Sequence, residues 1–457
     1  MYHKRRIRDP LHNLIDFEAT QFDDAMWQVT QTRPFQRLRR IKQLGLSELV
    51  YPGATHSRFA HSLGVFHTAR MLMNIIERRL THASFQPNSA QRALAAAVLH
   101  DVGHGPFSHA FENVATRMEL LAADHEHVSD RLIRSGEIGE ILDKHLGTGF
   151  SQGAADVIKN GPTDIYGAVV SSQFDADRLD YMRRDPLMTG TQHGAIDFEW
   201  LIANLEIGTL PRGVDAQQLG TSETFLLGPK AIYAAETYVL GLFQLYPTVY
   251  FHKTTRGAEK LLEELLFRLF TLVRDGKYGK TGLPAKHPLV AFAKKPDDLE
   301  LFVEVDDTTV WGSLSLLARA KDPAIAELAG RLRDRKLYKC IDIRQILAQK
   351  IGSDDQQIEM SCESIVALLN DYLRVPVEIP GILIDHARRA PYKKVQESKG
   401  QLNQIRIKVD TGSSIDLISK SKVVAAIAPF RLDRVYVRTA EDRKIVNSIL
   451  LTEGVTC

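Results

Sequence analysis

The stretch RALAAAVLHDVGHGPFSH, residues 92–109, decides the fold. After Arg92 the run is apolar as far as Leu99, which predicts a buried helix. The helix ends on the doublet His100-Asp101, because the glycines that follow in VGHG must break it. A buried imidazole beside a buried carboxylate costs free energy unless a partner compensates them, and a divalent cation that binds both would do so. The segment therefore predicts an α-helical core with a candidate metal site at a helix end.

More than half of the sixteen histidines lie in the same part of the chain: His56, His61, His67, His82, His100, His104, His109, His125 and His127. A separate predicted helix, RFAHSLGVFHTAR, offers His61. A later segment, SSQFDADRLDY, offers Asp175 and Asp177 among apolar neighbours. Two imidazoles and two carboxylates suit a borderline first-row metal with positions left for water or phosphate oxygens. The pattern indicates a hydrolytic site.

Most of the remaining chain shows helical spacing of apolar residues. Helices are predicted over residues 19–31, 34–49, 60–79, 90–102, 106–119, 125–146 and 229–275. Pro106 suits the first helical position, where its missing N–H would be unpaired anyway. Residues 204–228 predict a short β-hairpin. Strand patterns from Val375 onward, VPVEI, GILIDH, QIRIKV and DRVYV, predict a small α+β subdomain over residues 371–457, after a core over residues 1–370.

Composition sets the class of protein. The 457 residues are 44% hydrophobic and 25% charged with a net charge of +2, which is typical of a globular protein and demands no polyanionic partner. Cys340, Cys362 and Cys457 form no CxxC pair, so we expect neither a disulfide framework nor a cysteine zinc site. No stretch reaches the roughly 20 apolar residues that span a bilayer. We expect a cytoplasmic protein without membrane contact.

Four motifs in order, PGATHSRFAHSLGV, LHDVGHGPFSH, DHEH and DADRLDYMRRD, resemble the HD-domain deoxynucleoside triphosphate (dNTP) triphosphohydrolases, the family of the sterile-alpha-motif HD enzyme and its bacterial relatives. The resemblance starts near Arg8 and runs with interruptions to about residue 340. It implies a mainly α fold with an HD-superfamily helical core. We expect no sterile-alpha-motif domain before it, because the matching segment begins within the first ten residues.

The resemblance also implies roles for residues around the HD doublet. It makes the metal ligands His61, His100, Asp101 and Asp177, for a divalent transition metal such as Fe, Mn, Zn or Ni, with Mg²⁺ accompanying the triphosphate. It places an acid/base group at His104 with Glu126, and further catalytic histidines at His109 and His125. The alternative for His109 and His125 is a packing or surface histidine.

Substrate contacts follow from the same resemblance. Phosphate contacts fall on Arg58 and Arg178. Arg178 replaces the lysine of the family's best-known member, and Leu242 stands where that member has another phosphate-binding arginine. The contacts to the sugar and to its surroundings fall on Gln43, Leu44, Tyr181, Asp185 and Tyr250. Gln43 and Asp185 hold the 3′-hydroxyl, while Leu44 and Tyr250 crowd the 2′ position; the alternative for Leu44 and Tyr250 is that they are core residues. A 2′-hydroxyl there would be buried without a partner, at a cost of about 1 to 3 kcal/mol, which favours deoxynucleotides.

The resemblance implies a homotetramer that binds an activating nucleotide between subunits. The matching positions are Gln31, Gln36, Arg39, His252, Lys253, Arg335 and Lys339. Gln31 stands where the family's best-known member has an aspartate that reads guanine. An aspartate accepts from both N–H groups of the guanine edge, whereas glutamine offers one acceptor and one donor. We therefore expect an activator less restricted to guanine.

Two other functions stay open at this point. One is an HD phosphohydrolase acting on a nucleoside monophosphate, a cyclic dinucleotide or guanosine tetraphosphate, because the HD ligands alone do not fix the substrate. The other is a nucleic-acid-binding regulator that uses a basic patch. The residues of that patch are Lys4, Arg5, Arg6, Arg8, Arg37, Arg39, Arg40 and Lys42.

Overall fold

A computed structural model of the chain describes residues 2–80, 84–192, 196–211, 220–352, 354–375, 377–392, 402, 404–409 and 413–452. The chain forms two compact units, each assembled from separated segments. Unit 1 comprises Met1–Ser108, Leu121–Leu245 and Ala390–Ala428, and unit 2 comprises His109–Leu120, Tyr246–Arg389 and Pro429–Cys457. The sequence boundary near residue 371 stays a prediction about domain organisation.

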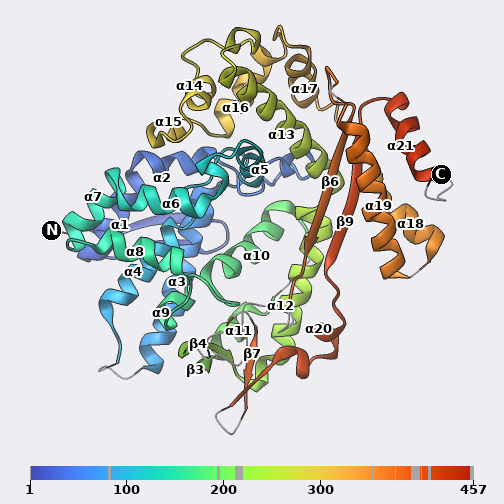
Figure 1. The fold of residues 1–457 in the computed structure, drawn as a ribbon. Helices are drawn as coiled ribbons and strands as arrows, with labels where there is room; N and C mark the ends of the chain where they lie inside the picture. Colours follow the sequence, from blue (N-terminus) through green and yellow to red (C-terminus); the bar gives the residue numbers. More distant parts are fainter. Residues whose placement is uncertain are drawn as a thin grey trace. The chain divides into compact units, whose positions relative to one another are not determined.

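Unit 1 is mainly helical (Figure 1). Its helices are α1 (Gln21–Gln31), α2 (Arg33–Arg37), α3 (Arg58–Arg79), α4 (Pro87–Leu99), α6 (His125–Arg134), α7 (Gly136–Leu146), α8 (Phe150–Asn160), α9 (Ile165–Ala168), α10 (Ala176–Thr189), α11 (Phe198–Ala203), α12 (Ile232–Leu245) and α20 (Lys422–Ala426). Short 3-10 turns cover Leu38–Arg40, Ser47–Leu49, Leu121–Ala123, Pro229–Ala231 and Leu417–Ser419.

Two small sheets complete unit 1. Strands β1 (Arg5–Asp9) and β2 (Asn13–Phe17) form an antiparallel hairpin. The predicted hairpin over 204–228 is confirmed as β3 (Leu205–Pro211) paired with β4 (Thr221–Leu227). The sheet continues with β7 (Arg406–Lys408) and β8 (Ser414–Asp416) in the order β3-β4-β7-β8.

Helix α3 organises the part of unit 1 that matters for function, because it packs against both α4 and α10. The apolar residues of α4, from Ala93 to Leu99, are buried, as the alanine-rich run predicts. Helix α3 begins at Arg58 after Ser57, whose side chain accepts a hydrogen bond from the Ala60 N–H. Helix α10 begins in the same way after Asp175, which accepts from the Arg178 N–H. Capping residues thus fix where both helices begin.

Unit 2 combines helices with one antiparallel sheet. Its helices are α5 (His109–Arg117), α13 (Lys253–Arg274), α14 (Pro288–Lys294), α15 (Leu299–Val303), α16 (Asp307–Leu317), α17 (Pro323–Arg333), α18 (Ile343–Ile351), α19 (Asp355–Leu373) and α21 (Ala440–Thr452), with a π-helical turn at Tyr246–Tyr250 and a 3-10 turn at Tyr278–Lys280. Its strands are β5 (Lys339–Asp342), β6 (Ile382–Arg389) and β9 (Phe430–Val437), in the order β5-β9-β6. Ile365, Val435 and Val446 are fully buried in the core between sheet and helices.

The mainly α class is therefore confirmed, but several predicted elements are wrong in their extent. Residues 34–49 do not form one helix, and the predicted helix 125–146 divides at Gly136, whose φ is +68°. Helix α5 begins at His109 and not at Pro106, because Phe107 and Ser108 have φ angles of +55° and +52°, in the left-handed region. The predicted helix 229–275 is interrupted by the π-helical turn.

The C-terminal strand pattern is correct in part. GILIDH and DRVYV contribute to β6 and β9, whereas QIRIKV supplies β7, which pairs with β4 in unit 1. The described residues of VPVEI form no strand, and Pro376 lies outside the described residues, as does the predicted His82. Among the described residues, no helix is both long and apolar enough to cross a bilayer.

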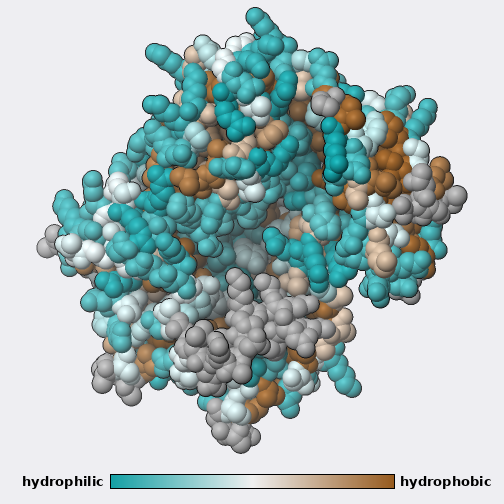
Figure 2. All heavy atoms as spheres, in the orientation of Figure 1, coloured by the Kyte–Doolittle hydropathy of each residue, from teal (hydrophilic) through white to brown (hydrophobic). Residues whose placement is uncertain are grey.

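Several exposed apolar side chains of unit 2 lie along α19, on the segment that follows it and on α21. They are Met360, Leu368, Tyr372, Val375, Val377 and, on α21, Leu451. Figure 2 shows hydrophobic atoms over the region of α19 and α21.

The core of unit 2 gives a direct test of this packing. Truncating Ile365 to alanine removes a fully buried side chain of α19, so we expect unfolding to need about 2 to 5 kcal/mol less free energy. Met360, on the same helix, is 64% exposed, and Met360→Ala should change stability by less than about 0.5 kcal/mol. Urea denaturation of both variants makes the comparison. Equal effects would contradict the packing described for α19.

Candidate metal centre

Three helices bring the four expected metal ligands of unit 1 together. His61 lies in the first turn of α3, His100 and Asp101 directly follow α4, and Asp177 lies in the first turn of α10. Ligand atoms of His61, His100 and Asp101 all lie within 4.8 Å of one another. Asp177 Oδ1 lies 2.9 Å from His61 Nε2 and 3.7 Å from His100 Nε2. The Asp177 side chain is 37% exposed, so the cluster opens to solvent on that side.

The donor atoms fit a cation. His100 Nδ1 donates to the carbonyl of Ala97 at 2.8 Å, which leaves the lone pair on Nε2. That Nε2 is buried and has no hydrogen-bond partner among the described residues. Such an atom is costly to bury unless a ligand satisfies it. With two imidazoles and two carboxylates, the set suits a divalent transition metal.

The electrostatics of the cluster also favour a cation. Burial opposes protonation of His61, yet hydrogen bonds to Asp177 and Asp180 raise its pKa to about 10. Burial would raise the pKa of Asp101, but Arg58, His100 and His104 hold it well below its usual range. Burial would also raise the pKa of Asp177, but hydrogen bonds from His100 and His61 lower it. Both ligand carboxylates are therefore charged near neutral pH, and they stabilise positive charge between them.

A glycine permits the turn after the HD doublet. A Cβ on Gly103 would lie 2.3 Å from the carbonyl oxygen of His125 and 2.4 Å from the backbone nitrogen of Ser129. The Gly103 N–H donates to Ser129 Oγ, and that hydroxyl donates to the carbonyl of His100. The end of α4 is thus tied to α6, which holds His100 and Asp101 in place.

Two expected catalytic histidines lie beside the cluster. His104 is buried, with Nε2 3.3 Å from Asp101 Oδ1, and its ring stacks on His125 at 3.8 Å between centroids. Burial, with the charges of Arg58 and His125, holds the pKa of His104 well below its usual value, so the ring is neutral. Glu126 is exposed at the start of α6. The pairing of His104 with Glu126 stays a prediction.

The two expected phosphate-binding arginines have different surroundings. Arg58 is buried, with Nε donating to Ser108 and Nη1 to Asp101. It therefore orients a metal ligand and balances its charge. The Arg178 side chain is 34% exposed and bonds to Gln173 Oε1 at 3.1 Å. Tyr181 follows one turn later on α10 and is half-buried. Contacts of these residues with phosphate stay predictions.

The expected sugar-binding residues of unit 1 also gather. The Gln43 N–H donates to the carbonyl of His56, and His56 Nε2 lies 2.9 Å from Asp185 Oδ1. Gln43 Oε1 is buried without a hydrogen-bond partner among the described residues. Leu44, next to it, is 9% exposed. The group offers a buried acceptor beside an apolar wall.

Three expected activator contacts lie on α1, α2 and the turn that follows. Gln36 Oε1 accepts from Arg39 Nε at 2.8 Å, and the Arg39 guanidinium stacks 3.6 Å above the ring of Phe59. Gln31 is exposed, and its amide donates to Thr30 Oγ1 at 2.9 Å.

The remaining expected site residues belong to unit 2. They are His109, Tyr250, His252, Lys253, Arg335 and Lys339. His109 is exposed and pairs with Glu112 at 2.7 Å. Tyr250 ends the π-helical turn, a feature often found at functional sites. His252 caps α13 by accepting from the Thr254 N–H. That these residues act together with the site residues of unit 1 stays a prediction.

Sequence reasoning missed a buried group behind His61. Asp180 accepts from His61 Nδ1 at 2.8 Å and from His12 Nε2 at 2.7 Å, and it pairs with Arg184. The signal was partly present, because Asp177 and Asp180 are three residues apart and so share one face of a helix. The partner His12 lies too far away in sequence to be found by spacing.

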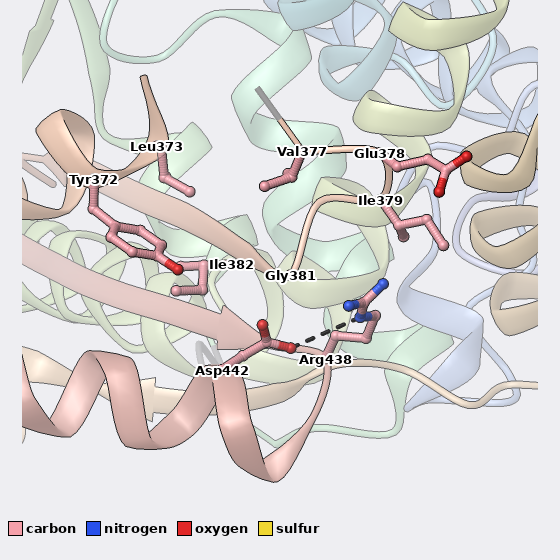
Figure 3. Close-up of a pocket in the computed structure, with 9 residues that line it drawn as sticks. All are labelled: Tyr372, Leu373, Val377, Glu378, Ile379, Gly381, Ile382, Arg438 and Asp442. Atoms are coloured by element: carbon pink, nitrogen blue, oxygen red, sulfur yellow. Dashed lines mark ion pairs between the residues drawn. The ribbon is translucent and has the colours of Figure 1, made fainter. Parts of the chain in front are cut away.

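A pocket of about 290 Å³ lies in unit 2 between the end of α19 and β6 (Figure 3). Tyr372, Val377 and Ile382 line its apolar part. Glu378, Arg438 and Asp442 are its charged residues, and Arg438 Nε pairs with Asp442 Oδ2 at 3.7 Å. It contains none of the expected site residues, and we assign it no chemistry.

Known proteins resemble this chain over the same region. The model of the HD domain matches residues 58–182. YwfO, an uncharacterized protein from Bacillus subtilis, is 34% identical over 337 residues, 73% of this chain and 71% of that protein. The Dictyostelium discoideum homologue of deoxynucleoside triphosphate triphosphohydrolase SAMHD1 is 26% identical over 80% of this chain and 65% of that protein.

A solved structure agrees with this similarity. A phosphohydrolase from Bacteroides thetaiotaomicron has a TM-score of 0.70 and 25% identity, over 96% of this chain and all of that one. The histidine and aspartate cluster lies within residues 58–182, the segment that matches the HD domain. The cluster, the fold and the sequence similarity therefore point to the same family. The chain belongs to the HD-domain family of phosphohydrolases, together with YwfO and the SAMHD1-type enzymes.

Proposed function

We propose that the chain hydrolyses dNTPs to a deoxynucleoside and inorganic triphosphate. Water attacks the α-phosphorus, the bond from phosphorus to the 5′-oxygen breaks, and a proton must reach the departing oxygen. His61, His100, Asp101 and Asp177 hold a divalent transition metal, and Mg²⁺ accompanies the triphosphate. When bound, the transition metal lowers the pKa of water and neutralises charge on phosphate oxygens.

The observation that carries the proposal is the metal-ligand cluster itself, with three ligand groups within 4.8 Å and a buried, unsatisfied His100 Nε2. His104, 3.3 Å from Asp101, is the proposed acid/base group with Glu126, and His109 and His125 are further proton-transfer candidates. Arg58 supports the proposal by balancing the charge of Asp101.

Recognition of a deoxyribose is supported by the group around Gln43. Its buried Oε1 is an acceptor suited to the 3′-hydroxyl, and Asp185 is a second acceptor held by His56. Leu44 presents an apolar wall for the 2′ side, and Tyr250 is assigned to the same wall by resemblance. The named activity of the SAMHD1-type relatives supports the same substrate class.

The basic patch supports nucleic-acid binding less well. Arg37 is fully buried, and three of the N-terminal cations pair with acids: Lys4 with Asp16 and Glu18, Arg5 with Asp24, and Arg6 with Asp16. A solvent-exposed array of unpaired cations is the feature that phosphate-backbone binding needs.

The metal-ligand assignment predicts the effect of Asp177→Ala. Loss of this anionic ligand should remove most of the metal and lower turnover more than about 100-fold, because losses outside the ligand set alone reach 10- to 100-fold. Metal analysis of purified protein, with dNTP hydrolysis in parallel, makes the test. The control is Asp156→Ala, which removes an aspartate that pairs with Arg134 on the surface of unit 1. This variant should keep both the metal and the rate of dNTP hydrolysis. Full metal occupancy in Asp177→Ala would exclude Asp177 as a ligand.

Sugar selectivity predicts a difference between dGTP and GTP. Leu44→Ala should open space beside the 2′ carbon and reduce the preference for dGTP by about tenfold, equivalent to about 1.4 kcal/mol. Leu46→Ala, a fully buried neighbour, should cost stability without changing the preference. The measurement is kcat/KM for each nucleotide, with release of inorganic triphosphate as the readout. Equal hydrolysis of GTP and dGTP by the wild-type protein contradicts the deoxyribose assignment.

We further propose a homotetramer with nucleotide activation, in which Gln31 relaxes the choice of base. Several dNTPs should then activate comparably, and Gln31→Asp should shift the preference toward guanine by about 10- to 100-fold. Gln28→Asp, which adds the same charge one turn earlier on α1, is the control. Light scattering gives the mass, and activation assays give the preference. A monomer, or absolute dependence of the wild-type protein on GTP or dGTP, contradicts this proposal.

A further inference from the structure

Asp180 is a carboxylate with all of its acceptor positions in use. It has no solvent exposure. Oδ1 accepts from His12 Nε2 at 2.7 Å and from Arg184 Nη2 at 3.0 Å. Oδ2 accepts from His61 Nδ1 at 2.8 Å and from Arg184 Nε at 2.7 Å. A carboxylate offers about four lone-pair positions, so this one is saturated.

This bonding fixes the chemistry of His61. An ionised carboxylate only accepts, so His61 Nδ1 must carry a hydrogen. When the ring is neutral, as a metal ligand must be, its lone pair is therefore on Nε2. Nε2 is the atom that faces Asp177 and Asp101, at 2.9 Å and 3.8 Å. Carboxylates bound to the far nitrogen of a ligand histidine set its tautomer and orientation in metal sites generally.

The N-terminal hairpin completes the network. Arg184, fully buried, makes a bidentate pair with Asp9 at 2.8 Å and 3.1 Å. Asp9 also accepts from the N–H groups of Leu11 and His12, which shape the turn between β1 and β2. The turn thus presents His12 to Asp180 and holds Arg184 in place.

The approach of α10 to α3 leaves no freedom for this network. A Cβ on Gly64 would lie 2.1 Å from Asp180 Oδ1 and 2.3 Å from Arg184 Nη2. Gly64, one turn after His61 on α3, leaves the space that the side chains of Asp180 and Arg184 occupy. The bonding partners are therefore set by packing.

We propose that His12, Asp180 and Arg184 are positioning residues that orient His61 for metal binding, so that the hairpin at residues 5–17 helps to set the affinity of the metal centre. This inference rests on the proposed metal site. It assigns a function to a hairpin that contributes no metal ligand.

The test is the affinity of the metal-free full-length protein for Co²⁺, measured by competition with a chelator, together with the visible absorption spectrum of the bound ion. His12→Leu removes one donor to Asp180 and should weaken Co²⁺ binding by about 10-fold or more. His12→Gln keeps an N–H donor and should restore binding to within about threefold of wild type. A general loss of packing would not be restored in this way.

His67→Leu is the matched control. His67 packs against His12 with the ring centroids 4.6 Å apart and the planes tilted by 39°, but it makes no hydrogen bond to Asp180 among the described residues. The His67→Leu protein should bind Co²⁺ with the affinity of the wild-type protein. Asp180→Asn is the second variant, because it keeps the size of the side chain and loses its charge; it should also weaken binding.

A folded His12→Leu or Asp180→Asn protein with wild-type affinity and spectrum would overturn the inference. Failure of both variants to fold in the metal-free state would also overturn it, since the network would then be a folding element. The proposed metal site itself would be rejected by a different result. In that case the wild-type protein would bind no Co²⁺, or would bind it no better than the Asp177→Ala protein does.

Discussion

The close approach of α10 to α3 at Gly64 is the constraint on which the site depends. It lets two aspartates of one helix contact both nitrogens of one histidine on the other: Asp177 meets Nε2 of His61, and Asp180 meets Nδ1. A Cβ at Gly64 would lie 2.1 Å from Asp180 Oδ1 and 2.3 Å from Arg184 Nη2, so any larger residue would displace these two side chains from their hydrogen bonds. Helix packing and the chemistry of the site are therefore the same feature of the molecule.

The charged side chains buried around the metal-ligand cluster each need a partner of opposite charge. Asp101 is balanced by Arg58, Asp180 by Arg184, and Arg184 also by Asp9. Removal of one partner from such a pair commonly costs about 3 to 5 kcal/mol, because it leaves an uncompensated charge. Asp177 differs, since its side chain is partly exposed and no arginine pairs with it among the described residues. It is the ligand whose charge remains available to an incoming cation.

Sequence reasoning could predict the features that depend on local pattern. The alanine-rich helix, its end at His100 and the hairpin over 204–228 follow from spacing and turn residues, and the structure has them. The four expected ligands lie together because their motifs flank buried helices. The positive φ angles of Phe107 and Ser108 had no such signal, since neither residue type favours the left-handed region.

Long-range partners were not predictable from one sequence. His12 contacts a residue 168 positions away, and β7 joins a hairpin formed about 180 residues earlier in the chain. Arg58 was expected to contact phosphate, yet its guanidinium bonds to Asp101 and Ser108. Such pairings depend on the tertiary fold, in which several arginines and acids compete for partners.

Anomalous diffraction from crystals of the Mn²⁺-loaded protein tests the central claim most directly. We expect one strong peak about 2.0–2.3 Å from His61 Nε2, His100 Nε2 and a carboxylate oxygen of Asp101 and of Asp177. No peak there, or a peak bound by other residues while this cluster stays metal-free, would contradict the account.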